Sequence, residues 1–278
     1  MDSSEGKHKF IIFCVYIINS FISYYPHFIK IAGKLNSFLQ SLKHQKINQR
    51  LFPFLFLFII QSLFSGECVF LIHGLARTSK SFSKLSHQLS DSGYTVINID
   101  YPSTKHPIDT LTENYIKPVI LQTQCTKKHI ITHSMGGILF RNFIQNNHLS
   151  ELGHVVMLAP PNQGSQVVDK LKDYYLFKVI NGPAGSELGT NLSSKPLLLD
   201  SAFYSLGVIA ANKSFNWINS LIIPGQDDGK VSIASTKLKG MADHIIVPSN
   251  HTYIASNPKT IQQVFYFLKN GSFQKPCN

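Results

Sequence analysis

Short apolar runs alternate with amphipathic segments along most of the chain after residue 66. The runs occupy residues 69–72, 94–99, 129–132, 155–158, 221–223 and 245–247. Uninterrupted apolar runs of this kind are typical of strands buried on both faces. Apolar residues at helical spacing predict helices over 80–92, 108–124 (with a break near Pro118), 136–147 and 258–269. The alternation predicts an α/β fold, with a mostly parallel central sheet and helices on both faces.

The stretch from about 160 to 215 interrupts this alternation. It is rich in Gly, Asn, Ser and Pro, and it carries the apolar and aromatic cluster Tyr174, Tyr175, Leu176 and Phe177. We interpret it as a cap or lid inserted over a site. An ordinary irregular connection is the alternative.

Two apolar stretches, residues 10–25 and 51–64, precede the α/β pattern and divide the chain into an N-terminal region, 1–65, and a main domain, 66–278. The second stretch has 14 residues, fewer than the ~20 of a membrane-spanning helix. It follows Lys46 and Arg50 and ends in small residues, as in a secretory signal peptide. This predicts an exported protein, located in the periplasm, at a membrane or outside the cell. Two uncleaved membrane anchors, or a start site downstream of Met1, are the alternatives.

The net charge of +11 does not indicate a nucleic-acid-binding protein. Lys and Arg residues are scattered, whereas nucleic-acid binders usually carry a basic cluster or stripe. Association of the N-terminal region with a membrane fits this charge better. The cysteines and histidines show no spacing typical of a metal site, so we expect no metal and no cofactor.

The chemically informative residues lie directly after predicted strands, where the ligands of parallel sheets bind. Ser134 stands in the sequence THSMGG between a strand and a helix, on a turn that would project its hydroxyl above the sheet. A carboxylate pair, Asp227 and Asp228, follows the run 221–223, and His251 follows the run 245–247. Serine needs a base to act as a nucleophile, and the order Ser, acid, His supplies one.

The segments VFLIHGLARTSKSF, ITHSMGG, PGQDDGKV and SNHT resemble those of the α/β-hydrolase superfamily, and within it bacterial lipases and esterases, over residues 68–270. Thr132 departs from the usual Gly two residues before the serine. The resemblance implies a catalytic triad in which Ser134 is the nucleophile, His251 the base and Asp228 the acid, with Asp227 as the alternative acid. It also implies an oxyanion hole formed by the backbone N–H groups of Leu75 and Met135.

These residues predict a serine acyl hydrolase that cleaves carboxylic esters or lipids through an acyl-enzyme. An acyltransferase that uses the same acyl-enzyme, and a membrane-tethered binding protein with an inert triad, are the alternatives.

The resemblance also implies a disulfide between Cys68 and Cys125. In the family's sheet the strands that follow these cysteines are parallel neighbours, which places both cysteines at the amino end of the sheet. Two unrelated thiols, or pairing of either residue with Cys277, are the alternatives. A disulfide would persist only in an oxidising compartment, in agreement with export.

Overall fold

Six parallel strands form one sheet, in the order β2-β1-β3-β4-β5-β6, in the computed structural model of the chain. The structure describes residues 66–275. The strands are β1 (Glu67–Ile72), β2 (Thr95–Ile99), β3 (Lys127–His133), β4 (Leu152–Leu158), β5 (Leu206–Ala211) and β6 (Asp243–Val247).

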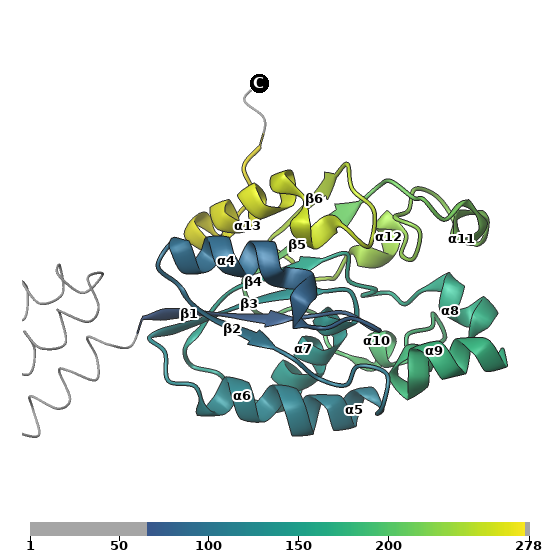
Figure 1. Ribbon diagram of the computed structural model, residues 1–278, viewed down its shortest axis with the longest axis horizontal. Helices are drawn as coiled ribbons and strands as arrows, with labels where there is room; N and C mark the ends of the chain where they lie inside the picture. Colours follow the sequence, from purple (N-terminus) through teal and green to yellow (C-terminus); the bar gives the residue numbers. More distant parts are fainter. Residues whose placement is uncertain (1–65, 276–278) are drawn as a thin grey trace, which may run out of the picture. The chain divides into compact units, whose positions relative to one another are not determined.

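Helices cover both faces of this sheet (Figure 1). One face is covered by α4 (Ser83–Asp91) and α13 (Pro258–Asn270), and the other by α5 (Ile108–Leu111), η3 (Thr112–Ile116), α6 (Lys117–Gln122) and α7 (Met135–Asn146). The break predicted near Pro118 corresponds to η3, a π-helical turn that ends two residues before this proline. The predicted α/β fold with helices on both faces is confirmed.

The two-sided cover explains why the central strands are uninterrupted apolar runs. In β1, Phe70 and Ile72 point into the core beside α5–α7, whereas Val69 and Leu71 point into the core beside α4 and α13. Successive side chains of a strand alternate between faces, so burial of both faces requires an apolar residue at every position.

The predicted position of the fifth strand was wrong. Residues 221–223 are not a strand: Leu221, which is exposed, and Ile222 end α11 (Trp217–Ile222), and Ile223 is the residue that follows this helix. The strand at this place in the sheet is Leu206–Ala211, all of it buried. Gly207, Ala210 and Ala211 weaken its apolar signal. A Cβ at Gly207 would lie 2.5 Å from the Phe267 ring, so α13 packs directly on the strand's backbone.

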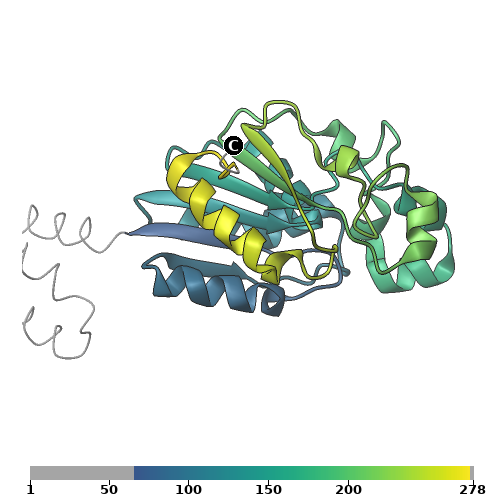
Figure 2. The same cartoon turned by 90° about the horizontal axis from the view of Figure 1, so that it is seen from above.

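The insertion after β4 is therefore shorter than expected and ends before β5, at residue 205 rather than 215. It contains three helices: α8 (Gln166–Leu171), α9 (Tyr175–Ser186) and α10 (Lys195–Leu198). α8, α9 and α11 project beyond the carboxyl ends of the strands in both views (Figures 1 and 2). We call residues 160–205 the cap.

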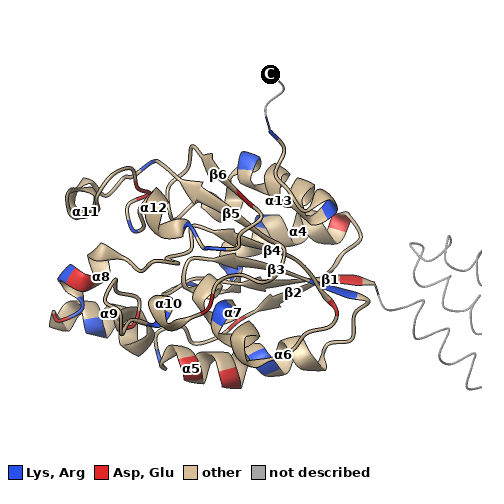
Figure 3. Cartoon of the chain, turned by 180° about the vertical axis from the view of Figure 1, so that it is seen from behind, with Lys and Arg blue, Asp and Glu red and all other residues tan. Residues whose placement is uncertain are grey.

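A disulfide joins Cys68 in β1 to Cys125 before β3, with a Cα–Cα distance of 5.9 Å. Both cysteines lie at the amino end of these adjacent strands, opposite the cap. The predicted signal or anchor region, 1–65, and Cys277 lie outside the described residues. From residue 66 to residue 275, no helix combines the length and the apolar character needed to span a membrane. Basic and acidic residues are spread over many elements of this part of the chain (Figure 3).

Candidate active site

Ser134 occupies a strained turn between β3 and α7. Its φ of 53° and ψ of −124° are unfavourable for a residue with a Cβ, at a cost of ~1–3 kcal/mol. The turn brings α7 so close to β1 that a Cβ at Gly136 would lie 2.2 Å from the carbonyl oxygen of Ile72. Glycine is therefore required two residues after the serine. Thr132, two residues before it, is fully buried, so the turn accommodates this larger residue.

Three side chains predicted from the sequence meet at this turn. The Oγ atom of Ser134 lies 2.9 Å from Nε2 of His251, and Nδ1 of His251 lies 2.7 Å from Oδ2 of Asp228. All three residues are buried. The arrangement can pass the serine proton to the imidazole while the carboxylate stabilises the imidazolium that results.

Backbone hydrogen bonds hold Asp228 in place. Its Oδ1 accepts from the N–H groups of Lys230, at 3.0 Å, and Val231, at 2.8 Å, which leaves Oδ2 for the imidazole. The N–H of His251 in turn donates to the carbonyl oxygen of Asp228 at 3.1 Å. The acid and the base are therefore fixed to each other through both backbone and side chain.

The neighbouring carboxylate, Asp227, has different partners. Its Oδ1 accepts from Ser220 Oγ at 2.8 Å and from the N–H of Gly229 at 2.7 Å. These contacts tie the loop to α11. The geometry thus favours Asp228 over Asp227 as the partner of the imidazole.

His133, beside the serine, has a role that the sequence did not reveal. Its Nε2–H donates to the carbonyl oxygen of His251 at 2.9 Å. Burial, and next the charge of His251, lower the pKa of His133 well below its usual range, so it remains neutral. A neutral, buried imidazole acts as a fixed hydrogen-bond donor that orients the segment carrying His251.

The predicted oxyanion-hole residues flank the serine. Met135 is the first residue of α7, so its N–H has no partner within the helix. Leu75 follows Gly74, where an added Cβ would lie 3.1 Å from the Ser134 Cβ. The segment that carries the Leu75 N–H therefore runs directly against the serine, as two donors aimed at one oxygen require.

His73 and Tyr101 support this segment. The Tyr101 hydroxyl donates to the His73 carbonyl oxygen at 2.5 Å, and the two rings stack with centroids 4.0 Å apart. Burial lowers the pKa of His73, although Gly74 and Asp100 oppose the shift. The pair fixes the turn that leads from β1 to Leu75.

A cavity of about 300 Å³ opens at Ser134 and His251. The cap forms its apolar side, with Val167, Val168, Leu171, Phe177 and Leu188. Polar lining residues outside the cap include Arg77, Asn216, Asn219 and Lys230. Sequence reasoning gave these four residues no role. Arg77 and Lys230 lie within segments that resemble the family, but at positions to which the resemblance assigns no function. Asn216 and Asn219 lie at the start of and within α11, outside those segments.

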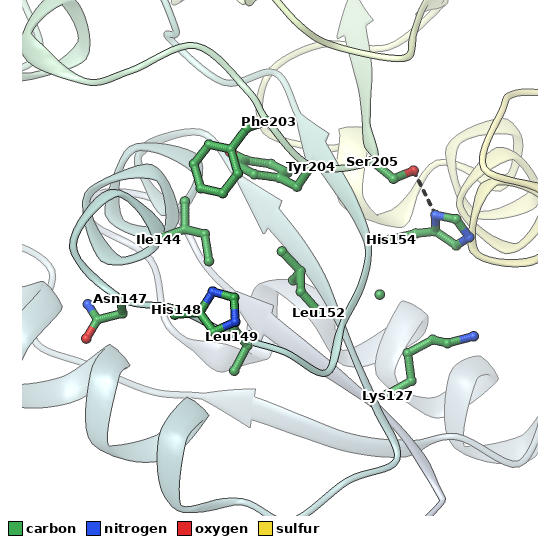
Figure 4. Close-up of a pocket in the computed structure, with 11 residues that line it drawn as sticks. Lys127, Ile144, Asn147, His148, Leu149, Leu152, His154, Phe203, Tyr204 and Ser205 are labelled. Atoms are coloured by element: carbon green, nitrogen blue, oxygen red, sulfur yellow. Dashed lines mark hydrogen bonds between the residues drawn. The ribbon is translucent and has the colours of Figure 1, made fainter.

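A second Ser–His pair lies in a separate cavity of about 430 Å³ at the amino ends of β3 and β4 (Figure 4). There the Oγ of Ser205 lies 2.8 Å from Nδ1 of His154. Within residues 66–275, the His154 side chain forms no hydrogen bond with a carboxylate. Ser205 lies directly before β5 rather than on a turn between a strand and a helix. Within the described residues this pair therefore lacks the carboxylate that completes the series at Ser134.

Comparisons with known proteins agree with this fold. Residues 68–174 match the sequence model of the Alpha/beta hydrolase family. No curated protein matches the chain significantly in sequence.

Solved structures share the fold at low identity. The mature lipase BlEst2 of Bacillus licheniformis is 18% identical with a TM-score of 0.53, and the match covers 74% of this chain and 92% of that one. Phospholipase PlaB of Legionella pneumophila is 18% identical with a TM-score of 0.57, over 74% of this chain and 60% of that one. A metagenomic carboxyl esterase is 16% identical with a TM-score of 0.59, and the match covers 69% of this chain and 66% of that one. The chain spans about half, 52%, of the propeptide form of the lipase.

Proposed function

We propose that this chain, a member of the α/β-hydrolase superfamily, is a serine hydrolase that cleaves carboxylic esters through an acyl-enzyme on Ser134. The observation that carries the proposal is the hydrogen-bonded series Ser134–His251–Asp228 at the mouth of a cavity. The apolar side of the cavity suits an acyl chain. The likeness to proteins named as lipases, a phospholipase and a carboxyl esterase supports an ester or lipid substrate.

In the proposed reaction His251 Nε2 removes the proton of Ser134 as the serine oxygen attacks the ester carbonyl. The N–H groups of Leu75 and Met135 stabilise the tetrahedral oxyanion. The imidazolium, stabilised by Asp228, then gives its proton to the leaving alcohol. Water, activated by the same imidazole, hydrolyses the acyl-enzyme and regenerates the serine.

The test is labelling with a fluorophosphonate, together with hydrolysis of p-nitrophenyl esters of increasing chain length. We expect stoichiometric labelling of the wild-type protein, and loss of both labelling and turnover in Ser134→Ala with unchanged circular dichroism. Ser205→Ala, which removes the serine of the second Ser–His pair, is the matched control and should retain both. Wild-type turnover in Ser134→Ala would refute the mechanism, and an unlabelled wild-type protein would favour a binding protein with an inert triad.

The same acyl-enzyme permits transfer to an alcohol in place of water. Product analysis with added glycerol or methanol separates the two reactions. We expect free acid as the main product. A dominant transfer product at low alcohol concentration would reassign the chain as an acyltransferase.

We also propose that the protein is exported. The disulfide Cys68–Cys125 supports this, because structural disulfides persist in oxidising compartments. The apolar stretch at 51–64 supports it from the sequence. Fractionation of cells, with N-terminal sequencing of the product, tests both export and cleavage: cytosolic recovery of the full chain would contradict the proposal.

A further inference from the structure

The proposed reaction determines which part of an ester lies on which side of the cavity. His251 must protonate the leaving oxygen, so the alcohol part of the substrate lies next to the imidazole. The acyl chain then occupies the apolar side formed by the cap, around Val168, Leu171 and Phe177. Residues near His251 are therefore the ones that contact the alcohol.

Two cations, Arg77 and Lys230, line the cavity together with His251. Arg77 is half-buried, and its Nη2 donates to Thr252 Oγ1 at 3.0 Å, directly beside His251 in the chain. Lys230 follows Asp228 by two residues and also lines the cavity. Burial, and next the charge of Arg77, lower the pKa of Lys230, whereas the charge of Asp228 raises it. Both charges therefore lie within Coulombic reach of Lys230.

The charge of Asp228 acts on Lys230, but the carboxylate oxygens of Asp228 are already bonded to His251 and to backbone N–H groups. The residues that line the cavity include no Asp or Glu. No salt bridge to Arg77 or Lys230 is formed by another described residue. Two like charges held close together, with no carboxylate among the residues that line the cavity, favour binding of an anion.

We propose that Arg77 and Lys230 form an anion subsite for the alcohol part of the substrate. The preferred substrate is an ester with an apolar acyl chain and an alcohol that carries a phosphate or carboxylate. This inference rests on the proposed function. The bond changes are those of ordinary hydrolysis: water is consumed, the acyl C–O bond breaks, and the anionic alcohol leaves with a proton from His251.

The first test compares two soluble substrates with the same acyl chain, the butyryl esters of 4-nitrophenol and of 3-carboxy-4-nitrophenol. We expect wild-type kcat/KM to be higher for the carboxylated ester. The ratio should fall about five- to tenfold in Arg77→Gln or Lys230→Gln, and further in the double variant. The preference should also weaken as salt is raised, because ions screen exposed charges.

The matched control is Lys84→Gln, which removes an exposed cation of α4 outside the cavity. It should retain the wild-type ratio. A wild-type protein that does not prefer the anionic ester, or a double variant that keeps the preference, would overturn the proposal.

A second pair of substrates distinguishes the source of the anion. Vesicles of phosphatidylglycerol and of phosphatidylcholine present the same ester bonds with an anionic and a zwitterionic alcohol part. Faster hydrolysis of phosphatidylglycerol, lost in the double variant, identifies a lipid headgroup. A preference confined to the soluble esters identifies a small anionic ester.

Binding without turnover separates failure of the subsite from failure of the proposed function. Glycerol 3-phosphate is titrated calorimetrically into Ser134→Ala and into the same variant that also carries Arg77→Gln and Lys230→Gln, with glycerol as the neutral control. We expect binding of the phosphate to weaken at least tenfold in the triple variant. Equal binding by both variants would refute the subsite even if the protein proves to be an esterase.

Discussion

The Nε2 atom of His133 lies 2.9 Å from the backbone carbonyl oxygen of His251, so one buried imidazole holds the segment that carries the other. His133→Leu removes the donor and leaves that carbonyl without its buried partner. We expect kcat to fall about tenfold or more and the free energy of unfolding to fall by ~1–3 kcal/mol. His133→Gln, whose amide can donate from a similar position, should restore most of kcat. Equal loss in both variants would indicate that His133 acts through packing alone.

The same residue makes the protein sensitive to acid. The pKa of His133 is lowered in the native state, whereas an unfolded histidine has a pKa of ~6.5. Above this pH both states are neutral and His133 contributes nothing to the pH dependence. Below it the unfolded state binds a proton that native His133 does not, so stability falls by up to ~1.4 kcal/mol per pH unit. Urea unfolding at pH 7.5 and 5.5 should show a smaller decrease for His133→Gln than for the wild type; equal decreases would exclude this residue as a source.

Asp228 and Asp227 should respond differently to the same substitution. Asp228→Asn removes the charge that stabilises the imidazolium, so we expect kcat for an ester to fall by ~10⁴-fold. Asp227→Asn disturbs only the contacts with Ser220 and Gly229 and should lower kcat much less. Steady-state kinetics of both variants is the measurement. The reverse order of effects would move the acid to Asp227.

The disulfide should stabilise the domain without affecting the chemistry. Cys68 and Cys125 are 57 residues apart in sequence, and on the chain-entropy model closing this loop is worth ~4 kcal/mol. The double variant Cys68→Ala/Cys125→Ala should unfold at lower urea concentration, while its kcat, measured where it is folded, stays near the wild-type value. Reducing agent should shift the wild-type midpoint and leave that of the variant unchanged. Free thiols at both positions in purified exported protein would argue against the bond.

Phe177 and Leu176 offer a matched test of the cap. Phe177 lines the cavity, whereas Leu176, next to it in α9, is 67% exposed. Phe177→Ala should change the preferred acyl chain length. Its effect on kcat/KM should be several-fold larger for esters with a long acyl chain than for acetate esters. Leu176→Ala should leave the chain-length profile of soluble esters as in the wild type. Identical profiles in both variants would show that the cap does not select the acyl chain.

Local patterns determined most of the sheet and the positions of Ser134 and His251. Buried parallel strands need apolar residues on both faces, so five of the six strands stand out as apolar runs. The strained turn at Ser134 needs a small residue at Gly136, which makes this position visible in the sequence. The prediction missed β5, where the Phe267 ring of α13 packs so closely on the backbone that only glycine fits at position 207.

Only the tertiary structure decided the contacts between segments far apart in the chain. Both Asp227 and Asp228 carry a carboxylate after a predicted strand, and only the hydrogen bonds of their loop direct Asp228 toward His251. His133 donates its hydrogen bond to the carbonyl oxygen of His251, which lies 118 positions further along the chain. Arg77 and Lys230 reach one cavity from separate loops. Such residues leave no periodic or local signal, because their neighbours are set by how the strands and the cap pack rather than by spacing along the chain.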